Sequence, residues 1–191
     1  MRKPLRTKTG QIWVETVIYT LIGLTIIAVI LAVATPAIER YKDELVLEQT
    51  VSLLNDMDNT ITNVKDAGPG NRRIIPELMI KKGKIEISGE TNEINYMLEK
   101  TRVEYGEPDK TIVQGNMNIT TTKISDDYYS IEIEIVYNNL NITYRGEDTN
   151  KTFTEASVPY KIGIQNQGVQ EYDLGGGSTE KRIEIQIEEV S

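Results

Sequence analysis

The stretch Lys8-Thr-Gly-Gln-Ile-Trp-Val-Glu15, together with the run that follows it, decides the fold of this 191-residue chain. From Thr16 to Ile38 there are 23 residues without a charge. As a helix rising about 1.5 Å per residue, this run would extend about 35 Å. The hydrocarbon core of a bilayer is about 30 Å thick, so the run predicts one membrane-spanning helix. Glu15 is then an acidic residue at the start of a span, where a charge costs free energy.

The charges on either side of the run predict its orientation. Arg2, Lys3, Arg6 and Lys8 precede it with no acidic residue among them, whereas acidic and basic residues are mixed after it. Basic residues are enriched on the cytoplasmic side of membrane spans. We therefore expect the N-terminus in the cytoplasm and residues 39–191 outside the cell.

Composition excludes several classes of function. The chain has a net charge of −8, and without the four basic residues of its first ten positions the remainder carries −12. Such a body would be repelled by phosphate backbones, so no nucleic-acid partner is expected. The chain contains neither cysteine nor histidine, which removes disulfides, thiolate sites, histidine ligands and histidine-based triads. No spacing singles out a nucleophile with its base, so the sequence indicates no enzyme, no cofactor and no metal site.

The residues before the apolar run resemble a known processing signal. Gly10-Gln11, with Glu15 as the fifth residue after the bond between them, directly precedes the apolar helix. This arrangement resembles the class III signal peptide of the archaeal type IV pilin and archaellin-like family. The resemblance implies that a prepilin peptidase cuts between Gly10 and Gln11 on the cytoplasmic side, removing the leader of residues 1–10. An uncleaved signal anchor is the alternative that composition leaves open.

Cleavage would give Glu15 a partner. The new α-amine of Gln11 would lie about one helical turn from the Glu15 carboxylate, on its own chain or on a neighbouring one. Pairing of the two groups offsets part of the desolvation cost and can set the axial register of packed helices. The alternative is that the helix dipole alone stabilises an acid near the N-terminus.

The same resemblance implies a structural function. Family members leave the membrane through an assembly platform driven by a cytoplasmic ATPase, and they polymerise through the apolar helix into surface filaments that serve adhesion or motility. On this chain the helix of residues 11–38 would form the filament core, with Val17, Leu21, Leu24, Ile27 and Leu31 as its packing residues. A membrane-anchored monomeric binding module, or a pseudopilin of a secretion-like system, is the alternative function.

Residues 39–66 continue the helix with an amphipathic pattern. Apolar residues recur three or four positions apart, which predicts one buried stripe. The breaker cluster Ala67-Gly-Pro-Gly-Asn71 predicts that the helix ends near Lys65. The predicted stripe consists of Ile38, Tyr41, Leu45, Leu47, Val51, Leu54, Met57, Ile61 and Val64.

Residues 72–191 change to alternating patterns, which predict eight to ten short strands. The clearest predicted hairpin joins Ser130–Tyr137 to Leu140–Tyr144 through Asn138-Asn139, because asparagine tolerates the positive φ of tight turns. The fold class is therefore α+β, a long helix packed on an antiparallel sheet or sandwich. The other predicted strands are residues 73–79, 84–88, 94–98, 103–105, 117–124, 158–164 and 182–187.

Two further motifs lie in this region. Asn118, Asn141 and Asn150 each begin an Asn-X-Thr sequon, so they are candidate N-glycosylation sites on a segment expected outside the cell. The glycine-rich run of residues 175–179 lacks the Lys-Ser/Thr end and the following helix of a phosphate-binding loop. It is interpreted as a hairpin loop.

Overall fold

The computed structural model describes residues 9–173 and 179–190, and the predicted glycine-rich loop falls almost wholly outside these ranges. The chain separates into two compact units between Tyr41 and Lys42. Helix α1 (Thr9–Ala67) passes through this boundary and includes Pro36. The extent predicted for the helix is confirmed to within two residues at either end.

The end of α1 follows from its glycines. Gly68 and Gly70 have φ of +89° and +81°, a left-handed conformation that only glycine adopts readily. The Gly68 amide donates to the carbonyl of Lys65 at 3.3 Å, and Asn71 Nδ2 donates to the carbonyl of Ala67 at 2.7 Å. Two of the last carbonyls of the helix, those of Lys65 and Ala67, are therefore satisfied where the chain turns into the first strand.

The second unit contains two sheets. Sheet A has the order β1-β9-β10-β7, and β7 pairs with β10 in parallel. Sheet B has the order β4-β5-β6-β3-β2-β8, with every neighbouring pair antiparallel. The prediction of purely antiparallel pairing is thus wrong for one pair. Sheet A is built from β1 (Arg72–Leu78), β7 (Leu140–Tyr144), β9 (Tyr160–Asp173) and β10 (Thr179–Glu189). Sheet B is built from β2 (Lys84–Ser88), β3 (Glu93–Thr101), β4 (Thr111–Gln114), β5 (Met117–Ser125), β6 (Tyr128–Val136) and β8 (Asn150–Thr154).

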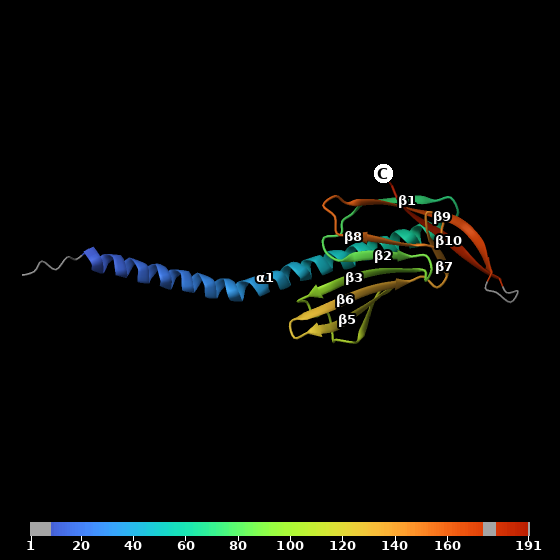
Figure 1. The fold of residues 1–191 in the computed structure, drawn as a ribbon. Coiled ribbons are helices and arrows are strands. Elements are labelled where there is room, and N and C mark those ends of the chain that lie inside the picture. Colours follow the sequence, from blue (N-terminus) through green and yellow to red (C-terminus); the bar gives the residue numbers. More distant parts are fainter. Residues whose placement is uncertain (1–8, 174–178, 191) are drawn as a thin grey trace, which may run out of the picture. The chain divides into compact units, whose positions relative to one another are not determined.

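The part of α1 after Lys42 shares one core with both sheets. Figure 1 shows β1 and β9 on one side of this part of the helix and β3, β5 and β6 on the other. The prediction that Ile38, Tyr41 and Leu45 belong to the buried stripe is wrong, because these three side chains are exposed. The remaining stripe is confirmed, with Val51 partly buried and Leu47, Leu54, Met57, Ile61 and Val64 buried.

The predicted hairpin is wrong in its pairing. Its two strands exist as β6 and β7, but β6 pairs with β3 and β5, whereas β7 pairs with β10. The chain does turn here, with the Leu140 amide 3.4 Å from the Tyr137 carbonyl, yet neither Asn138 nor Asn139 has a positive φ. A turn without positive φ does not match the twist of a two-stranded hairpin and splays its strands. Asn138-Asn139 therefore carries the chain from sheet B to sheet A.

Three smaller differences concern strand positions. Residues 103–105, predicted as a strand, lie in the irregular segment after β3. Strands β4 and β8 were not predicted, because each has only five residues or fewer and they carry little alternation. Among the apolar residues of β6 and β7, Tyr144 is partly buried and the following are buried: Ile131, Ile133, Ile135, Leu140 and Ile142.

Candidate functional site

The candidate site is the apolar part of α1 in the first unit. Between Trp13 and Tyr41 no described side chain is buried. The five residues predicted to pack in a filament core are all exposed, from 39 % for Val17 to 61 % for Leu24. By length and composition this is one helix able to cross a membrane. It is therefore a candidate membrane span whose apolar surface is not covered by its own chain.

Three threonine hydroxyls of this segment form hydrogen bonds within the helix. The hydroxyls of Thr20, Thr25 and Thr35 each donate to the carbonyl four residues earlier, at 2.7–2.8 Å. Such bonds remove the need for water around these side chains, as a segment surrounded by lipid or by other helices requires. A Cβ added at Gly23 would meet no atom within 4 Å. Nothing within the chain therefore requires a glycine at that position.

The predicted processing site lies at the beginning of the helix. Gly10 and Gln11 belong to the first turn of α1, which begins at Thr9. Leader residues 1–8 lie outside the described residues. Glu15 is exposed and lies four residues after Gln11 on the same helix, a separation of about 6 Å along the axis.

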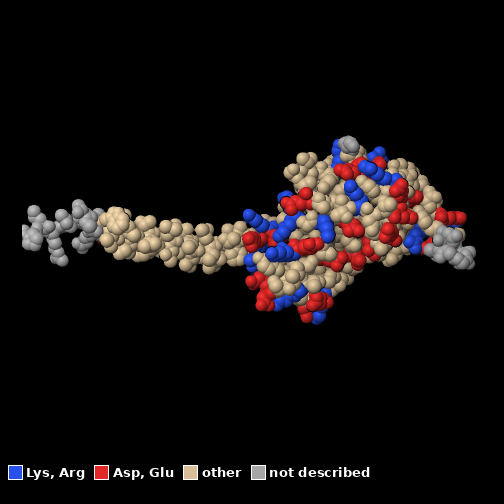
Figure 2. Space-filling model, viewed as in Figure 1, with Lys and Arg blue, Asp and Glu red and all other residues tan. Residues whose placement is uncertain are grey.

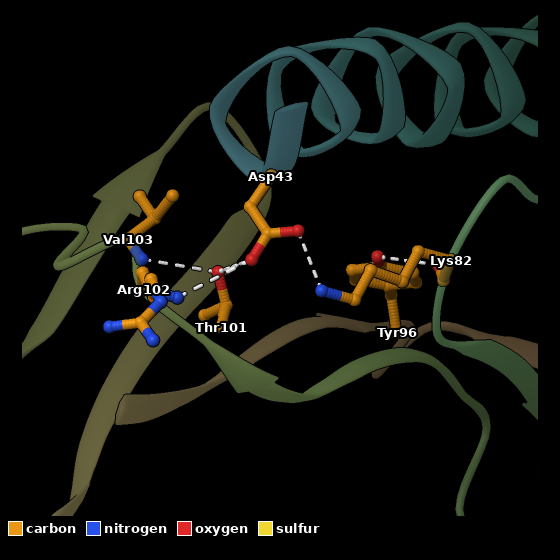
Figure 3. Close-up of polar contacts among 6 residues, drawn as sticks. All are labelled: Asp43, Lys82, Tyr96, Thr101, Arg102 and Val103. Atoms are coloured by element: carbon orange, nitrogen blue, oxygen red, sulfur yellow. Dashed lines mark hydrogen bonds and ion pairs between the residues drawn. The ribbon is translucent and has the colours of Figure 1, made fainter. Parts of the chain in front are cut away.

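The part of α1 in the second unit carries a buried carboxylate that the sequence pattern did not reveal. Asp43 is 7 % exposed and is enclosed by residues of the second unit, as Figure 3 shows. Lys82 Nζ lies 2.6 Å from its Oδ1, and Thr101 Oγ1 donates to its Oδ2 at 2.8 Å. The Tyr96 hydroxyl donates to the Lys82 carbonyl at 2.8 Å, and burial raises the pKa of Tyr96 to about 12. These contacts fix the helix where the chain enters the second unit.

A second buried carboxylate fixes the helix further along. Asp58, 6 % exposed, accepts a hydrogen bond from Asn116 Nδ2 at 2.8 Å and from the Tyr137 hydroxyl at 3.0 Å. Burial, followed by the charge of Asp58, raises the pKa of Tyr137. Asp43 lies four residues before Leu47 and Asp58 four residues after Leu54, both buried members of the stripe. That spacing was the available signal that both acids face the core rather than solvent.

The three sequons lie in different surroundings. Asn141 is buried in β7, and its Nδ2 donates to Asp148 at 3.0 Å. Asn118 is partly buried in β5, with Nδ2 3.3 Å from Glu134 Oε2. Asn150 is exposed in the edge strand β8 and accepts a bond from Ser88 through Oδ1. In the folded protein, the geometry favours Asn150 as the glycan acceptor and disfavours Asn141.

Comparisons with family models, with characterised proteins and with solved structures gave no match. Within the described ranges, no group of three or more acidic residues lies close enough together to hold a metal ion. A groove of about 500 Å³ lies between α1 and the β4–β5 turn.

Proposed function

We propose that this chain is a structural subunit of a type IV pilin-like surface filament. A prepilin peptidase would cut it between Gly10 and Gln11, and it would polymerise through the apolar part of α1 for adhesion or motility. The observation that carries this proposal is the contrast within one helix. The segment from Trp13 to Val33 has no cover in its own chain, whereas the segment after Lys42 packs its apolar stripe against two sheets.

The free energy gained by burying apolar side chains supports polymerisation through this segment. Each apolar side chain removed from water contributes about 1.5–3 kcal/mol, so this helix must lie either in lipid or against other helices. Before assembly, lipid would cover it as a membrane span. In a filament, helices of neighbouring copies would replace the lipid, and the open side of Gly23 would let one backbone approach another closely.

Glu15 distinguishes this helix from a simple membrane anchor. A carboxylate placed well inside a span costs about 2.5–3.5 kcal/mol, and less near its end. An anchor gains nothing from that cost. In a processed subunit, the α-amine of Gln11 would supply an opposite charge within reach, on the same chain or on the next copy. The cost is then offset, and the pair aligns neighbouring helices along the filament.

The charge distribution supports a division of roles. Figure 2 shows Lys, Arg, Asp and Glu over the second unit, whereas residues 16–38 contain none. In the proposed filament the second unit of each copy would face solvent and bear the contacts for adhesion or motility. Its net acidic surface would keep the filament soluble.

N-terminal sequencing of the protein extracted from the membrane tests the proposal. A chain beginning at Gln11 is expected. A chain beginning at Met1 would overturn processing and leave a signal anchor. A chain that begins at Gln11 but never forms filaments in its own cells would identify the alternative, an anchored module or pseudopilin.

A further inference from the structure

The groove between α1 and the β4–β5 turn runs along the exposed face of the helix. Glu48, Ser52 and Asn55 follow one another at steps of four and three residues, so they line the groove from one side of α1. Tyr105 and the turn at Gly115 line it from the side of the sheet. Its volume of about 500 Å³ lies within the range of about 300–1,000 Å³ that is usual for small-molecule sites.

The lining combines a little apolar surface with many hydrogen-bonding groups. Its aliphatic and thioether side chains are the least exposed, with Met117 buried and Val51 partly buried. Among the described residues, the side chains of Glu48, Ser52 and Asn55 have no hydrogen-bond or ion-pair partner. Their donors and acceptors are therefore available to a bound molecule.

Two side chains on the sheet side of the groove are held in place. The Tyr105 hydroxyl donates to Gln114 Oε1 at 3.0 Å, and Thr121 Oγ1 donates to the Tyr105 carbonyl. The first bond leaves Gln114 Nε2 free to donate and the Tyr105 oxygen able to accept from a ligand. Because these groups are already ordered, a ligand would bind them at a small cost in conformational entropy.

A second depression follows the groove along the same helix. The two-residue turn from β4 to β5 lines both, with Gly115 in the groove and Asn116 in a depression of about 240 Å³. From α1, Asn55 lines the first and Thr62 the second, about 10 Å further along the axis. The side chains of Asn138-Asn139 add two amides to the second depression, and neither amide has a partner among the described residues. The two depressions are referred to together as the α1 cleft.

The chemistry of the α1 cleft identifies the class of ligand. Amide and hydroxyl side chains both donate and accept hydrogen bonds, which matches the hydroxyl groups of a sugar. The Tyr105 ring offers a flat apolar surface for the C–H face of a sugar ring. The groove lining includes no lysine or arginine among the described residues, and the body of the chain is acidic, so an anionic ligand is disfavoured. A purely apolar ligand would leave the polar groups unpaired.

We propose that the α1 cleft binds a neutral oligosaccharide. One sugar ring packs on Tyr105 between Asn55 and Gln114, and a further ring reaches Asn138-Asn139. This inference deepens the proposed function, because it names the ligand class of the adhesive contact, and it rests on that function for its role at the cell surface.

An oligosaccharide array tests the site on the full-length, unassembled subunit. The protein is kept in a detergent without a sugar headgroup, and the array carries neutral and anionic oligosaccharides of increasing length. Wild type should bind neutral oligosaccharides and prefer them to single sugars. Derivatives with methylated hydroxyls should bind about tenfold less or worse, because the polar groups of the cleft would then lack partners. Binding of no oligosaccharide, or of anionic ones only, would overturn the proposal.

A substitution that fills the groove locates the binding. Ser52→Trp should lower oligosaccharide binding by about tenfold or more, because the indole occupies the space of the ligand. Gln49→Trp, at an exposed position of the same helix outside the lining, is the matched control and should bind as wild type does. Both positions are exposed, so the denaturation midpoint should be the same in the two variants. Wild-type binding by Ser52→Trp would place the sugar elsewhere and refute the site.

The Tyr105 ring and the Glu48 carboxylate allow two further measurements. Tyr105→Phe keeps the apolar ring and should bind about tenfold more tightly than Tyr105→Leu, which keeps an apolar side chain without a ring. Equal binding by these two variants would contradict stacking on the ring. Spermidine serves as a cationic probe for Glu48. Spermidine binding that Glu48→Gln abolishes, in a protein that binds no oligosaccharide, would assign the groove to a cationic ligand instead.

Filament formation separates this site from the proposed function. Ser52→Trp should form filaments as wild type does, because the cleft takes a ligand rather than the next copy. Loss of filaments from Ser52→Trp but not from Gln49→Trp would assign the cleft to a contact between copies and overturn the sugar site. Wild-type subunits that bind oligosaccharides yet never form filaments would overturn the filament and leave the site in place.

Discussion

The two parts of α1 are continuous in the chain and differ in everything that surrounds them. The first part, up to Tyr41, is apolar on all sides and has no buried side chain among its described residues. The second part, from Lys42, has a single apolar stripe, and its buried members lie in one core with both sheets. A helix that is apolar all round needs a partner on every side, whereas a striped helix needs one on a single side. The sheets of the second unit cover the single apolar side of the second part. The first part has no such cover within the chain, so its partners must come from outside it.

Acidic residues show the same difference. Asp43 and Asp58 in the second part are buried and receive hydrogen bonds from four side chains of their own chain. Glu15 in the first part has no ion-pair partner among the described side chains. In the proposed mature subunit its partner is an amine that exists only after cleavage. The chain thus pairs Asp43 and Asp58 during folding, and in the proposed subunit Glu15 would be paired only on assembly.

The largest effect is expected on filament formation when the Glu15 carboxylate is removed. Glu15→Ala should be processed normally yet form no filaments, because the helices lose the charge pair that sets their register. Processing is followed by electrophoretic mobility and filaments by electron microscopy. Glu44→Ala, which removes an exposed acid from the second part of the same helix, is the control and should assemble normally. Wild-type filaments from Glu15→Ala would refute the register role.

Truncation of Leu54 and truncation of Leu24 should affect two different properties, the stability of the second unit and the assembly of the proposed filament. Leu54→Ala creates a cavity in the core of the second unit and should lower its free energy of unfolding by about 3 kcal/mol. Leu24→Ala removes the same atoms from an exposed site and should leave that unfolding unchanged while weakening assembly. Denaturant titration in detergent, followed by far-ultraviolet circular dichroism, measures the first property. Equal destabilisation by both variants would contradict the separation of the two parts.

Removal of an aspartate side chain should lower the free energy of unfolding only where that side chain is buried. Asp58→Ala leaves Asn116 Nδ2 and the Tyr137 hydroxyl without their acceptor, and should cost about 2 kcal/mol. Asp56→Ala removes the same group from an exposed position two residues earlier and should change stability by less than about 0.5 kcal/mol. The same denaturant titration compares them. A loss from Asp56→Ala as large as that from Asp58→Ala would mean that charge, rather than enclosure, is responsible.

The last effect has no influence at neutral pH and concerns alkaline pH. Burial raises the pKa of Tyr96 to about 12, so the folded protein holds this proton while the unfolded chain releases it near pH 10. Stability from this group is present below pH 10 and is lost as the pH rises from about 10 to 12. Tyr96→Phe should show a shallower decline in unfolding free energy across that window. An unchanged slope would show that Tyr96 does not contribute.

Local patterns were enough to predict some of these features and not others. The extent of α1 and most of its buried stripe follow from composition, spacing and the glycines after Ala67, because these signals act within one or two turns. Pairing partners depend on distant segments. The Asn138-Asn139 turn was predicted to close a hairpin. In the structure, the residues on either side of it bind the distant Asn92, whose carbonyl accepts from the Tyr137 amide and whose Oδ1 accepts from the Ile142 amide.

The candidate site divides in the same way. The uncovered apolar helix could be predicted in full, since absence of charge is a property of the sequence itself. The spacing of Asp43 and Asp58 from buried leucines could indicate that both acids face the core, but their partners could not be predicted, because these come from β-strands and loops 39 to 79 residues away. Strand β4 was not predicted, because four uncharged residues are too few to show an alternating pattern.

The parallel pairing of β7 with β10 has a consequence for the timing of folding. The two inner strands of sheet A, β9 and β10, follow every other strand in the chain, whereas the outer strands β1 and β7 come earlier. In the proposed subunit, sheet A therefore cannot close while the chain is still crossing the membrane, because β1 has no partner until β9 emerges and β7 has none until β10 emerges. In that subunit, completion of the second unit would follow the end of translocation, and incorporation into a filament would require that the whole length has been delivered.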